Sequence, residues 1–503
     1  MQDILREHWG WQEQHQFVVS DCNAVRYIYT DHHYTPNAVT GAGDAYRAGV
    51  DNVCDAYAAP TNVSGAFALG LINDAVLDRS LRRQYEGLIR AGYFDTNTTN
   101  QYRTIGNEVL STPEHQALAL QVATEGIVLL KNQDNALPLQ LAGHTVAMIG
   151  MWANGTDQMQ GIYQGRAPYL HSPLFAAGQL GIKTHYATGP INETTTTGNW
   201  TDPAMSAANG ADVILFFGGI DSTIEKETLD RYQIGWPQSQ LALIEQLASF
   251  GKPMVVSQLG SQIDQRPLLD NANISGVIWA GYPGQDGGNA VMNIIAGKTS
   301  PAGRLPLTNY PADYVNEVPM TNMNLRPGAQ NPGRTYKWYD NATLPFGYGL
   351  SYTKFKAQYG ECAVEIAISD LLENCDEVHK DLCAFPDLPI TVENVGKATS
   401  DFVALSFANG QYGPEPYPLK SLHSYTRLAA VAPGETRAAH LEANIGTLAR
   451  RDEHGDQYLY PGEYKFMLDV PAQAEVHITL TGEAALLDKW CVGLQTLARE
   501  IIR

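Results

Sequence analysis

Carboxylates follow two apolar runs of this sequence, in places where they could act as nucleophile and acid. Asp21 ends the run 17–20, and the carboxylate-rich segment 220–231 follows the run 212–219. An apolar run that stops at a polar residue is typical of a buried parallel strand, and side chains at the carboxyl ends of such strands line active sites. Two carboxyl groups about 5 Å apart can hydrolyse a glycosidic bond with retention of configuration. Asp21 could supply the nucleophile and the acidic loop the acid.

Each segment also has a purely structural interpretation. Asp21 could cap the helix or turn that follows it, as short acidic side chains often do. The acidic loop could be solvated, with Asp230 paired to Arg231. If the loop is catalytic, Glu225 and Glu227 are the candidate acids. Residues two apart in an extended segment point to opposite sides, so only one of the two is expected to reach the substrate.

The residues around both segments resemble glycoside hydrolase family 3, and within it the xylan 1,4-β-xylosidase branch. The likeness rests on residues 4–11 and 45–51 around Asp21, on Ser-Asp-Cys followed by Ala-Val, and on the loop Asp-x-x-Ile-Glu-x-Glu-x-x-Asp-Arg. Further matches follow in order over segments 126–132, 279–288, 301–306, 331–339, 344–352 and 413–420. The resemblance implies that Asp21 is the nucleophile. It favours Glu225 over Glu227 as acid/base, because Ser-Thr-Ile-Glu aligns better with the Ser-Gly-Glu of related glucosidases.

The activity implied by this resemblance is that of a retaining, exo-acting β-glycosidase. The closest motifs imply a β-xylosidase that releases xylose from the non-reducing ends of xylo-oligosaccharides in xylan breakdown. An α-L-arabinofuranosidase shares these motifs, and a β-glucosidase is a third alternative. A catalytically inactive, carbohydrate-binding or structural remnant is a hypothesis of another class. No cofactor is expected, and the cysteines show neither a Cys-x-x-Cys pair nor a histidine spacing suited to zinc.

An α/β fold in successive domains is expected to position these residues. In the family the nucleophile strand comes late in a (β/α)8 barrel, so residues 1–95 resemble the carboxyl-terminal part of such a barrel. The chain then resembles an amino-terminally shortened member whose own activity is uncertain. Apolar runs that alternate with helical patterns predict an α/β sandwich with a mainly parallel sheet, and short alternating strands predict a fibronectin type III-like β-sandwich. The expected regions are 1–95, a linker at 96–139, the α/β sandwich at 140–350, a connector at 351–384, the β-sandwich at 385–482 and an unassigned tail at 483–503.

Local patterns predict several of the elements. Thr112-Pro113-Glu114 is a typical helix start. Strands are expected at 145–150, 212–219, 253–260, 276–281, 389–393, 402–407 and 463–470, and a helix at 237–250. Near the start, strands are expected before Asp21 and at 51–53. A long amphipathic helix should follow, with Leu77, Leu81, Tyr85 and Leu88 on one face and a solvated arginine stripe of Arg79, Arg82, Arg83 and Arg90.

Charge and hydropathy limit the partners. The 503 residues carry a formal net charge of −20, which argues against nucleic acid and against an anionic membrane surface, since both attract basic proteins. No run approaches the eighteen apolar residues of a membrane span. A neutral xylo-oligosaccharide or a related small glycoside is an easier partner for such a surface, and the oligomeric state stays open.

Cysteines and glycosylation sequons favour a secreted, extracellular glycoprotein, although Met1 opens directly into polar sequence without a signal peptide. The barrel resemblance places Cys22 and Cys54 after neighbouring strands, where a disulfide would join them. Cys375 and Cys383 share one short loop and form a second expected pair, leaving Cys362 and Cys491. Asn-x-Ser/Thr sequons begin at Asn62, Asn97, Asn154, Asn192, Asn199, Asn273 and Asn341.

Overall fold

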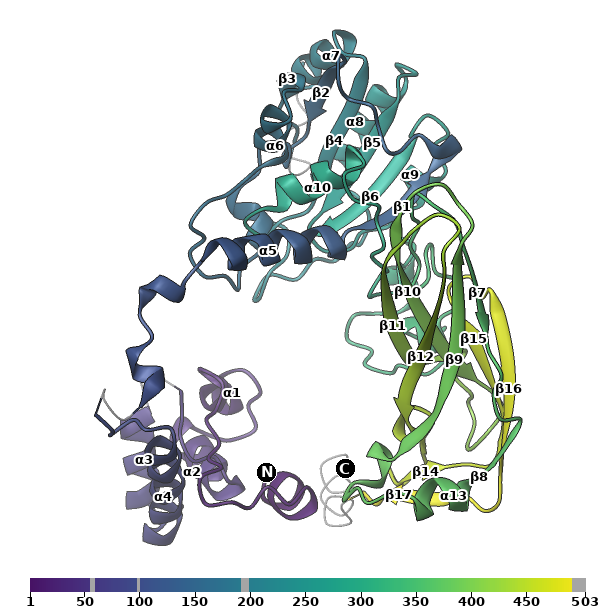
Figure 1. Ribbon diagram of the computed structural model, residues 1–503. Coiled ribbons are helices and arrows are strands. Elements are labelled where there is room, and N and C mark those ends of the chain that lie inside the picture. The colour runs from purple at the N-terminus through teal and green to yellow at the C-terminus, as the bar shows by residue number, and fades with distance from the viewer. Residues whose placement is uncertain (55–58, 97–99, 191–198, 491–503) are drawn as a thin grey trace. The chain divides into compact units, whose positions relative to one another are not determined.

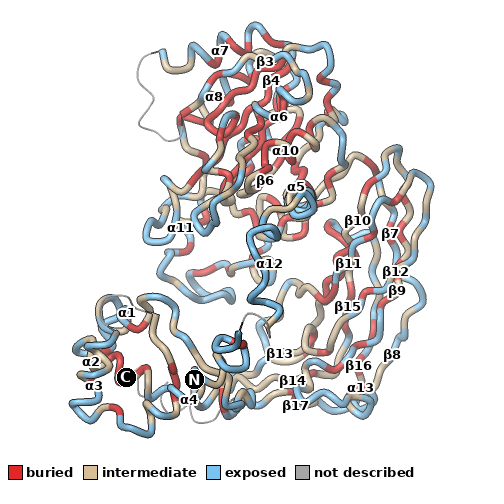
Figure 2. The backbone as a smooth tube through the Cα atoms, turned by 60° about the vertical axis from the view of Figure 1, so that its left-hand side comes forward, coloured by how far each residue is buried: buried red, intermediate tan, exposed pale blue. Residues whose placement is uncertain are grey.

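The structure, a computed structural model, describes residues 1–54, 59–96, 100–190 and 199–490. It divides into two compact units, a first unit built on Met1–Leu110 and a second unit, Ser111–Lys489. Figure 2 shows that buried residues concentrate along the strands of the second unit, whereas exposed and intermediate residues predominate in the first.

The first unit consists mainly of helices. Its expected strands reduce to a single parallel bridge between Val19 and Asn52. Backbone bonds from Ser20 N to Asn52 O (2.9 Å) and from Asp51 N to Val18 O (2.9 Å) extend this contact. A parallel strand needs further neighbours to complete its ladder, and the described residues of this unit supply one. The helices are η1 Gln2–His8, α1 Ala24–Thr30, α2 Ala38–Ala48, α3 Ala59–Ala68 and α4 Asp74–Arg90, followed by the short η2 Gln101–Thr104 and η3 Asn107–Val109.

Helix α4 is the predicted amphipathic helix, but part of its arginine stripe is not solvated. Arg79 donates to the Tyr46 carbonyl (2.7 Å) and Arg83 lies 3.4 Å from Asp51, so the arginine stripe is not simply solvated. Burial is the main cause that lowers the pKa of Arg79. On the apolar face, Leu81 and Tyr85 are 51% and 52% exposed. The pattern therefore predicted the helix correctly, and Arg82 and Arg90 are solvated as expected, whereas Arg79 and Arg83 contact other segments.

The second unit begins with an α/β sandwich (Figure 1). Its six-stranded sheet has the order β1-β6-β5-β4-β2-β3, parallel except for β1, which runs antiparallel to β6. Helices α6 and α10 pack with α5 over one face, and α7, α8 and α9 contribute to the core on the other. The strands are β1 Val128–Asn132, β2 Thr145–Ile149, β3 Lys183–Ala187, β4 Val213–Gly219, β5 Met254–Leu259 and β6 Gly276–Gly281. The helices are α5 Pro113–Gly126, α6 Pro173–Gln179, α7 Asp202–Asn209, α8 Gln238–Ala248, α9 Arg266–Leu269, α10 Gly287–Ile295, α11 Tyr314–Glu317 and α12 Thr335–Trp338, with short helices η4 Gln133–Asn135 and η5 Asp157–Gln160.

Local signals explain these elements. Thr112 caps α5 by accepting a hydrogen bond from His115 N (3.3 Å), as the sequence predicts. In α8 the side chains of Ile244 and Leu247 are fully buried, which matches the helical spacing of that segment. All seven residues of β4 are buried, as expected for an inner strand covered on both faces.

A β-sandwich completes the second unit. Its larger sheet has the order β11-β10-β15-β16-β8, and the smaller sheets have the orders β12-β9-β7 and β13-β14-β17. Tyr464, Phe466 and Leu468 of β15 share one fully buried face, as their alternation predicts. The elements are β7 Phe355–Tyr359, β8 Glu365–Ala367, α13 Ile368–Glu373, η7 Lys380–Leu382, β9 Ala384–Asn394, β10 Ser400–Asn409, β11 Ser421–Val431, β12 Thr436–Asn444, η8 Ile445–Thr447, β13 Arg450–Arg451, β14 Gln457–Leu459, β15 Gly462–Leu468, β16 Ala474–Thr481 and β17 Ala485–Asp488.

Both expected disulfides are present. Cys22 is bonded to Cys54 and Cys375 to Cys383, with Cα–Cα distances of 4.3 Å and 5.5 Å. Cys362 is a free thiol. Cys491 and the sequons at Asn97 and Asn192 lie outside the described residues, whereas Asn154, Asn199, Asn273 and Asn341 are exposed.

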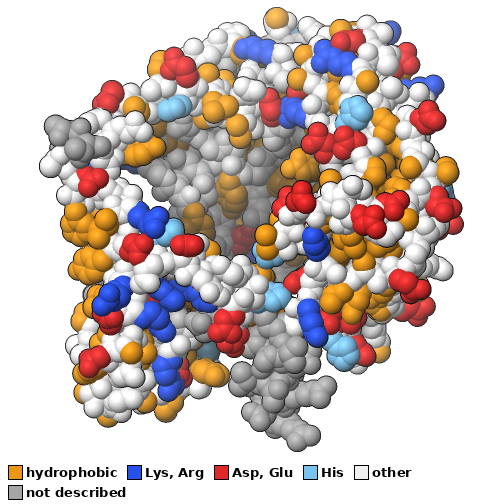
Figure 3. Space-filling view, turned by 60° about the horizontal axis from the view of Figure 1, so that its bottom comes forward, with side chains coloured by type: hydrophobic (Ala, Val, Ile, Leu, Met, Phe, Trp, Pro, Cys, Tyr) orange, Lys and Arg blue, Asp and Glu red, His pale blue; other side chains and the backbone are white. Residues whose placement is uncertain are grey.

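The surface carries a mixture of charged and apolar side chains. On the face in Figure 3, acidic and basic side chains are interspersed with hydrophobic ones. Among the described residues, no helix is long and apolar enough to cross a membrane.

A buried histidine makes the β-sandwich sensitive to acid. His423 in β11 has its Nδ1 2.8 Å from Thr447 Oγ1 and its ring against Phe385 and Phe466. Burial lowers its pKa from 6.5 to about 4. Between pH 6.5 and about pH 4 the unfolded chain therefore binds a proton at His423 that the folded sandwich excludes. The stability of the fold with neutral His423 is complete above pH 6.5 and is lost as pH falls toward 4.

We expect the sandwich to lose roughly 3 kcal/mol through His423 between pH 7 and pH 4. Urea unfolding followed at several pH values should show a weaker pH dependence in His423→Leu than in the unsubstituted protein. The exposed His440→Leu serves as the matched control and should leave the slope unchanged. Parallel pH profiles for His423→Leu and the unsubstituted protein would contradict the prediction.

Candidate active site

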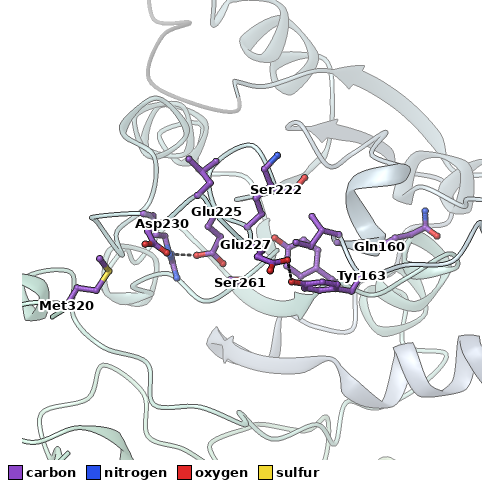
Figure 4. A pocket seen from close by; sticks show the side chains of 14 residues that line it. Gln160, Tyr163, Ser222, Glu225, Glu227, Asp230, Ser261 and Met320 are labelled. Atoms are coloured by element: carbon purple, nitrogen blue, oxygen red, sulfur yellow. Dashed lines mark hydrogen bonds and ion pairs between the residues drawn. The ribbon is translucent and has the colours of Figure 1, made fainter. Parts of the chain in front are cut away.

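A cavity opens where the order in which the chain adds strands to the parallel sheet reverses. From β2 the chain passes to β3 on one side and then to β4 on the other, so the loops that leave β2 and β4 diverge. In open α/β sheets, ligands bind at the carboxyl ends of the strands beside such a switch point. The cavity here measures about 520 Å³, and its lining comes from the loops after β2, β4, β5 and β6 together with Met320 (Figure 4).

The acidic loop after β4 is folded back on itself. The carboxylate of buried Asp221 accepts hydrogen bonds from Thr223 N (2.9 Å) and Thr223 Oγ1 (2.5 Å), and its carbonyl accepts from Glu225 N (3.2 Å). Lys226 and Leu229 then pair through both backbone bonds, at 3.1 and 2.9 Å. Because the loop turns instead of running straight, the premise of an extended segment does not hold, and Glu225 and Glu227 both line the cavity.

Glu225 and Glu227 both line the cavity but differ in how firmly they are held. Glu225 forms an ion pair with Arg231, and the two side chains are only 22% and 19% exposed. Glu227 is exposed and accepts a hydrogen bond of 2.5 Å from the Tyr163 hydroxyl, and Tyr163 is itself 81% exposed. Figure 4 shows the two carboxylates pointing to different partners across the cavity.

Arg231 does not pair with Asp230, the structural alternative for this loop. Its Nε contacts Glu225, and its Nη2 donates to the Gln262 carbonyl at 2.7 Å. Burial lowers the pKa of Arg231, and the adjacent Glu225 opposes that shift. The guanidinium therefore joins the acidic loop to the segment after β5.

Tyr282 lies in the segment after β6 and closes another side of the cavity. Burial, and secondarily the nearby Glu225, raise the pKa of its hydroxyl. The hydroxyl therefore stays protonated at neutral pH and can donate a hydrogen bond. The segment 279–288 matches the family in sequence, but its motif assigns no role to Tyr282. No sequence motif indicates that Tyr163 belongs to the site, because it lies 64 residues before Glu227 in a loop without a motif.

Buried polar contacts fix the strand ends that carry these loops. Gln240 of α8 binds both backbone groups of Gly219, accepting from its N at 2.8 Å and donating to its O at 2.7 Å. A side chain at Gly219 would meet the Leu259 carbonyl oxygen at 2.0 Å, and the backbone there has φ +125°. Glycine is therefore required where β4 ends and the acidic loop begins.

Asp21 lies in the first unit, exposed directly after the Val19 bridge. Its carboxylate accepts a hydrogen bond from Cys22 N (2.7 Å), whereas the N-cap of α1 is Asn23. Asp21 therefore does not cap α1. Its carboxylate and its carbonyl, which accepts from Ala24 N (3.1 Å), both bind within the turn before that helix, in line with the alternative that Asp21 caps a turn. The side chain is left accessible at the end of the extended segment.

The backbone before Asp21 is held by a buried ion-pair network. Asp51 lies 3.1 Å from Arg6 and accepts a hydrogen bond from Val18 N (3.0 Å). Ser20 Oγ accepts from Cys54 N (3.0 Å), beside the disulfide between Cys54 and Cys22. The arrangement presents Asp21 on a short, tethered segment. Thus the structure brings Glu225 and Glu227 together, and it places Asp21 in a separately described unit.

Comparisons with known proteins agree on one family. Residues 127–352 match the glycosyl hydrolase family 3 C-terminal domain. The chain is 47% identical over 496 residues to a "Probable exo-1,4-beta-xylosidase bxlB" of Aspergillus fumigatus, and 42% identical over 494 residues to the "Exo-1,4-beta-xylosidase bxlB" of Emericella nidulans. The alignments cover 97% of this chain and 64% of each relative. The chain belongs to glycoside hydrolase family 3.

A solved family 3 structure extends the likeness to three dimensions. The chain is similar to a GH3 exo-β-xylosidase (XlnD) in complex with a xylobiose aziridine activity-based probe, with a TM-score of 0.91 and 39% identity. That match covers 97% of this chain and 64% of the other. The family and the xylosidase branch inferred from the motifs are thereby confirmed. The chain spans about 64% of the length of the curated family 3 relatives it matches.

Proposed function

We propose that the protein is a retaining, exo-acting β-xylosidase that removes xylose from the non-reducing ends of xylo-oligosaccharides. The observation that carries this proposal is the firmly held Glu225 carboxylate in a cavity at the switch point of the sheet. It lies in a chain up to 47% identical to exo-1,4-β-xylosidases. The xylobiose probe in the complex of the XlnD relative supports a xylo-oligosaccharide as substrate.

The proposed reaction has two steps. The Asp21 carboxylate attacks the anomeric carbon while the bond from that carbon to the leaving oxygen breaks, and Glu225 gives its proton to that oxygen. Glu225, now a carboxylate, then takes a proton from water, and the water oxygen displaces Asp21 to release xylose with retained configuration. No cofactor takes part in either step. Tyr282, whose hydroxyl stays protonated, supplies a neutral donor at the cavity wall.

A secreted protein is part of the same proposal. The disulfides at Cys22–Cys54 and Cys375–Cys383 are of the kind that persists in oxidising compartments. The exposed sequons at Asn154, Asn199, Asn273 and Asn341 are accessible to glycosylation. An extracellular location would bring the enzyme to soluble fragments of xylan.

The test measures substrate preference and stereochemistry in the full-length protein. We expect 4-nitrophenyl β-xyloside to be cleaved with a higher kcat/KM than the α-L-arabinofuranoside or the β-glucoside. Proton NMR of xylotriose digestion should show β-xylose as the first anomer formed, together with xylobiose. A preference for either other glycoside would establish the corresponding alternative. Absence of turnover by the folded protein would favour the inactive, structural alternative.

A further inference from the structure

Arg231 is held from outside the acidic loop, which makes it a firm support for Glu225. Its Nη2 donates to Gln262 O (2.7 Å), and three residues later Ile234 O accepts from Asp264 N (2.8 Å). The buried Asp264 carboxylate is itself fixed by Ala312 N (2.9 Å) and Thr343 Oγ1 (3.0 Å). The guanidinium is therefore anchored to the framework after β5.

The two glutamates of the cavity contrast in this respect. Glu225 is paired through Arg231 to that framework, whereas the partner of Glu227 is the highly exposed Tyr163. A catalytic group must be held within a fraction of an ångström, because a displacement of about 1 Å can cost on the order of 100-fold in rate. A glutamate side chain with several rotatable bonds achieves this only when a fixed partner restrains it.

The charge of Arg231 also suits the carboxylate form of Glu225, which the first proposed step produces and from which the second begins. When Glu225 gives up its proton, a negative charge forms in a cavity partly shielded from water. A preorganised guanidinium beside that oxygen stabilises the charge without rearrangement. Nη1 of Arg231 is buried and has no hydrogen-bond partner among the residues that the structure describes.

We propose that Arg231 is a positioning residue that holds Glu225 at the cavity through both proton transfers. The inference rests on the proposed function. Arg231 would act on the substrate only through Glu225, whose proton goes to the leaving oxygen and is later replaced by one from water. Its removal should therefore affect only steps that depend on that proton.

The experiment compares Arg231→Met with the unsubstituted full-length protein on two substrates. Xylobiose needs protonation of its leaving group, and 2,4-dinitrophenyl β-xyloside does not. We expect kcat/KM for xylobiose to fall about 100-fold, and kcat/KM for the dinitrophenyl xyloside to stay within about 3-fold. On the latter substrate, kcat and KM should fall together, because the slowed second step also uses Glu225.

Two further variants keep the result interpretable. Arg231→Lys retains the charge and should recover kcat/KM for xylobiose to within about 10-fold of the unsubstituted protein. Arg427→Met is the matched control, because Arg427 forms ion pairs with Glu125 and Asp401 outside the cavity lining. This variant should leave kcat/KM unchanged for both substrates. If Arg231→Met fails to fold, the test is the ratio of kcat/KM for xylobiose to kcat/KM for the dinitrophenyl xyloside in Arg231→Lys.

Equal losses of kcat/KM on both substrates would overturn the proposal, because they would mean that Arg231 only supports the fold of the loop. Unchanged turnover of xylobiose by a folded Arg231→Met protein would overturn it as well. If the folded, unsubstituted protein cleaves neither xyloside, the proposed function itself fails and the inference fails with it. That result differs visibly from one in which activity is present and insensitive to Arg231.

Discussion

Replacing Asp21 with alanine in the full-length protein is expected to lower the turnover of an aryl β-xyloside on the order of 10⁴-fold or more. The physical reason is that no other group is proposed to form the glycosyl-enzyme bond. Asp78→Ala is the matched control, since Asp78 is an exposed aspartate of the same unit that pairs only with Arg82 in the contacts observed. Its initial rates should equal those of the unsubstituted protein.

Covalent labelling gives an independent readout of the same residue. A 2-fluoro xyloside with a good leaving group slows the second step more than the first, so the glycosyl-enzyme accumulates. Peptide mass mapping should find the added sugar on Asp21. A label on any other residue would reject Asp21 as the nucleophile, even if the alanine variant were inactive.

Glu225→Ala is expected to lower kcat/KM for xylobiose by roughly 10³-fold, because the leaving oxygen loses its proton donor. The kcat/KM for 2,4-dinitrophenyl β-xyloside should change little, since that leaving group departs without protonation. Azide should raise kcat on the latter substrate and give β-xylosyl azide, because the anion needs no general base. Steady-state kinetics with and without azide measure all three effects.

Glu227→Ala provides the comparison within the same loop. Glu227 is exposed and is held through an exposed tyrosine, so we expect losses below about 10-fold and no azide rescue. The opposite pattern, with rescue in Glu227→Ala and near-normal rates in Glu225→Ala, would reverse the assignment of the acid. It would also remove the basis for a positioning role of Arg231.

Sequence patterns predicted the four inner strands of the α/β sheet but missed the strands at its two edges, β1 and β3. The runs that became β2, β4, β5 and β6 are apolar because neighbours cover them on both faces. Strand β3, by contrast, lies at the edge, and its sequence Lys-Thr-His-Tyr-Ala is largely accessible. No apolar run marks such a strand. In the first unit the opposite error occurred, because the apolar run before Asp21 has one pairing partner and forms a bridge instead of a strand.

The candidate site was predictable only as far as local motifs reach. The acidic loop and Asp21 carry recognisable residue orders, so both could be named in advance. The pairing of Glu225 with Arg231 could not, because it depends on the two turns that fold residues 221–229 back on themselves. Tyr163 and Tyr282 reach the cavity from loops distant in sequence, and only the order of strands brings those loops together.

Because the cavity lies beyond the strand ends, the residues that form the core of the second unit differ from the residues that would contact a ligand in the cavity. The strands and their covering helices form the buried core, whereas the cavity is lined from the loops that begin after β2, β4, β5 and β6. Loops of this kind tolerate changes of length and composition that a packed core does not. Over evolutionary time, substrate range can therefore diversify by exchange of these loops while the sheet stays constant. For the proposed β-xylosidase, directed evolution of sugar preference would accordingly begin with the loops and leave the strands untouched.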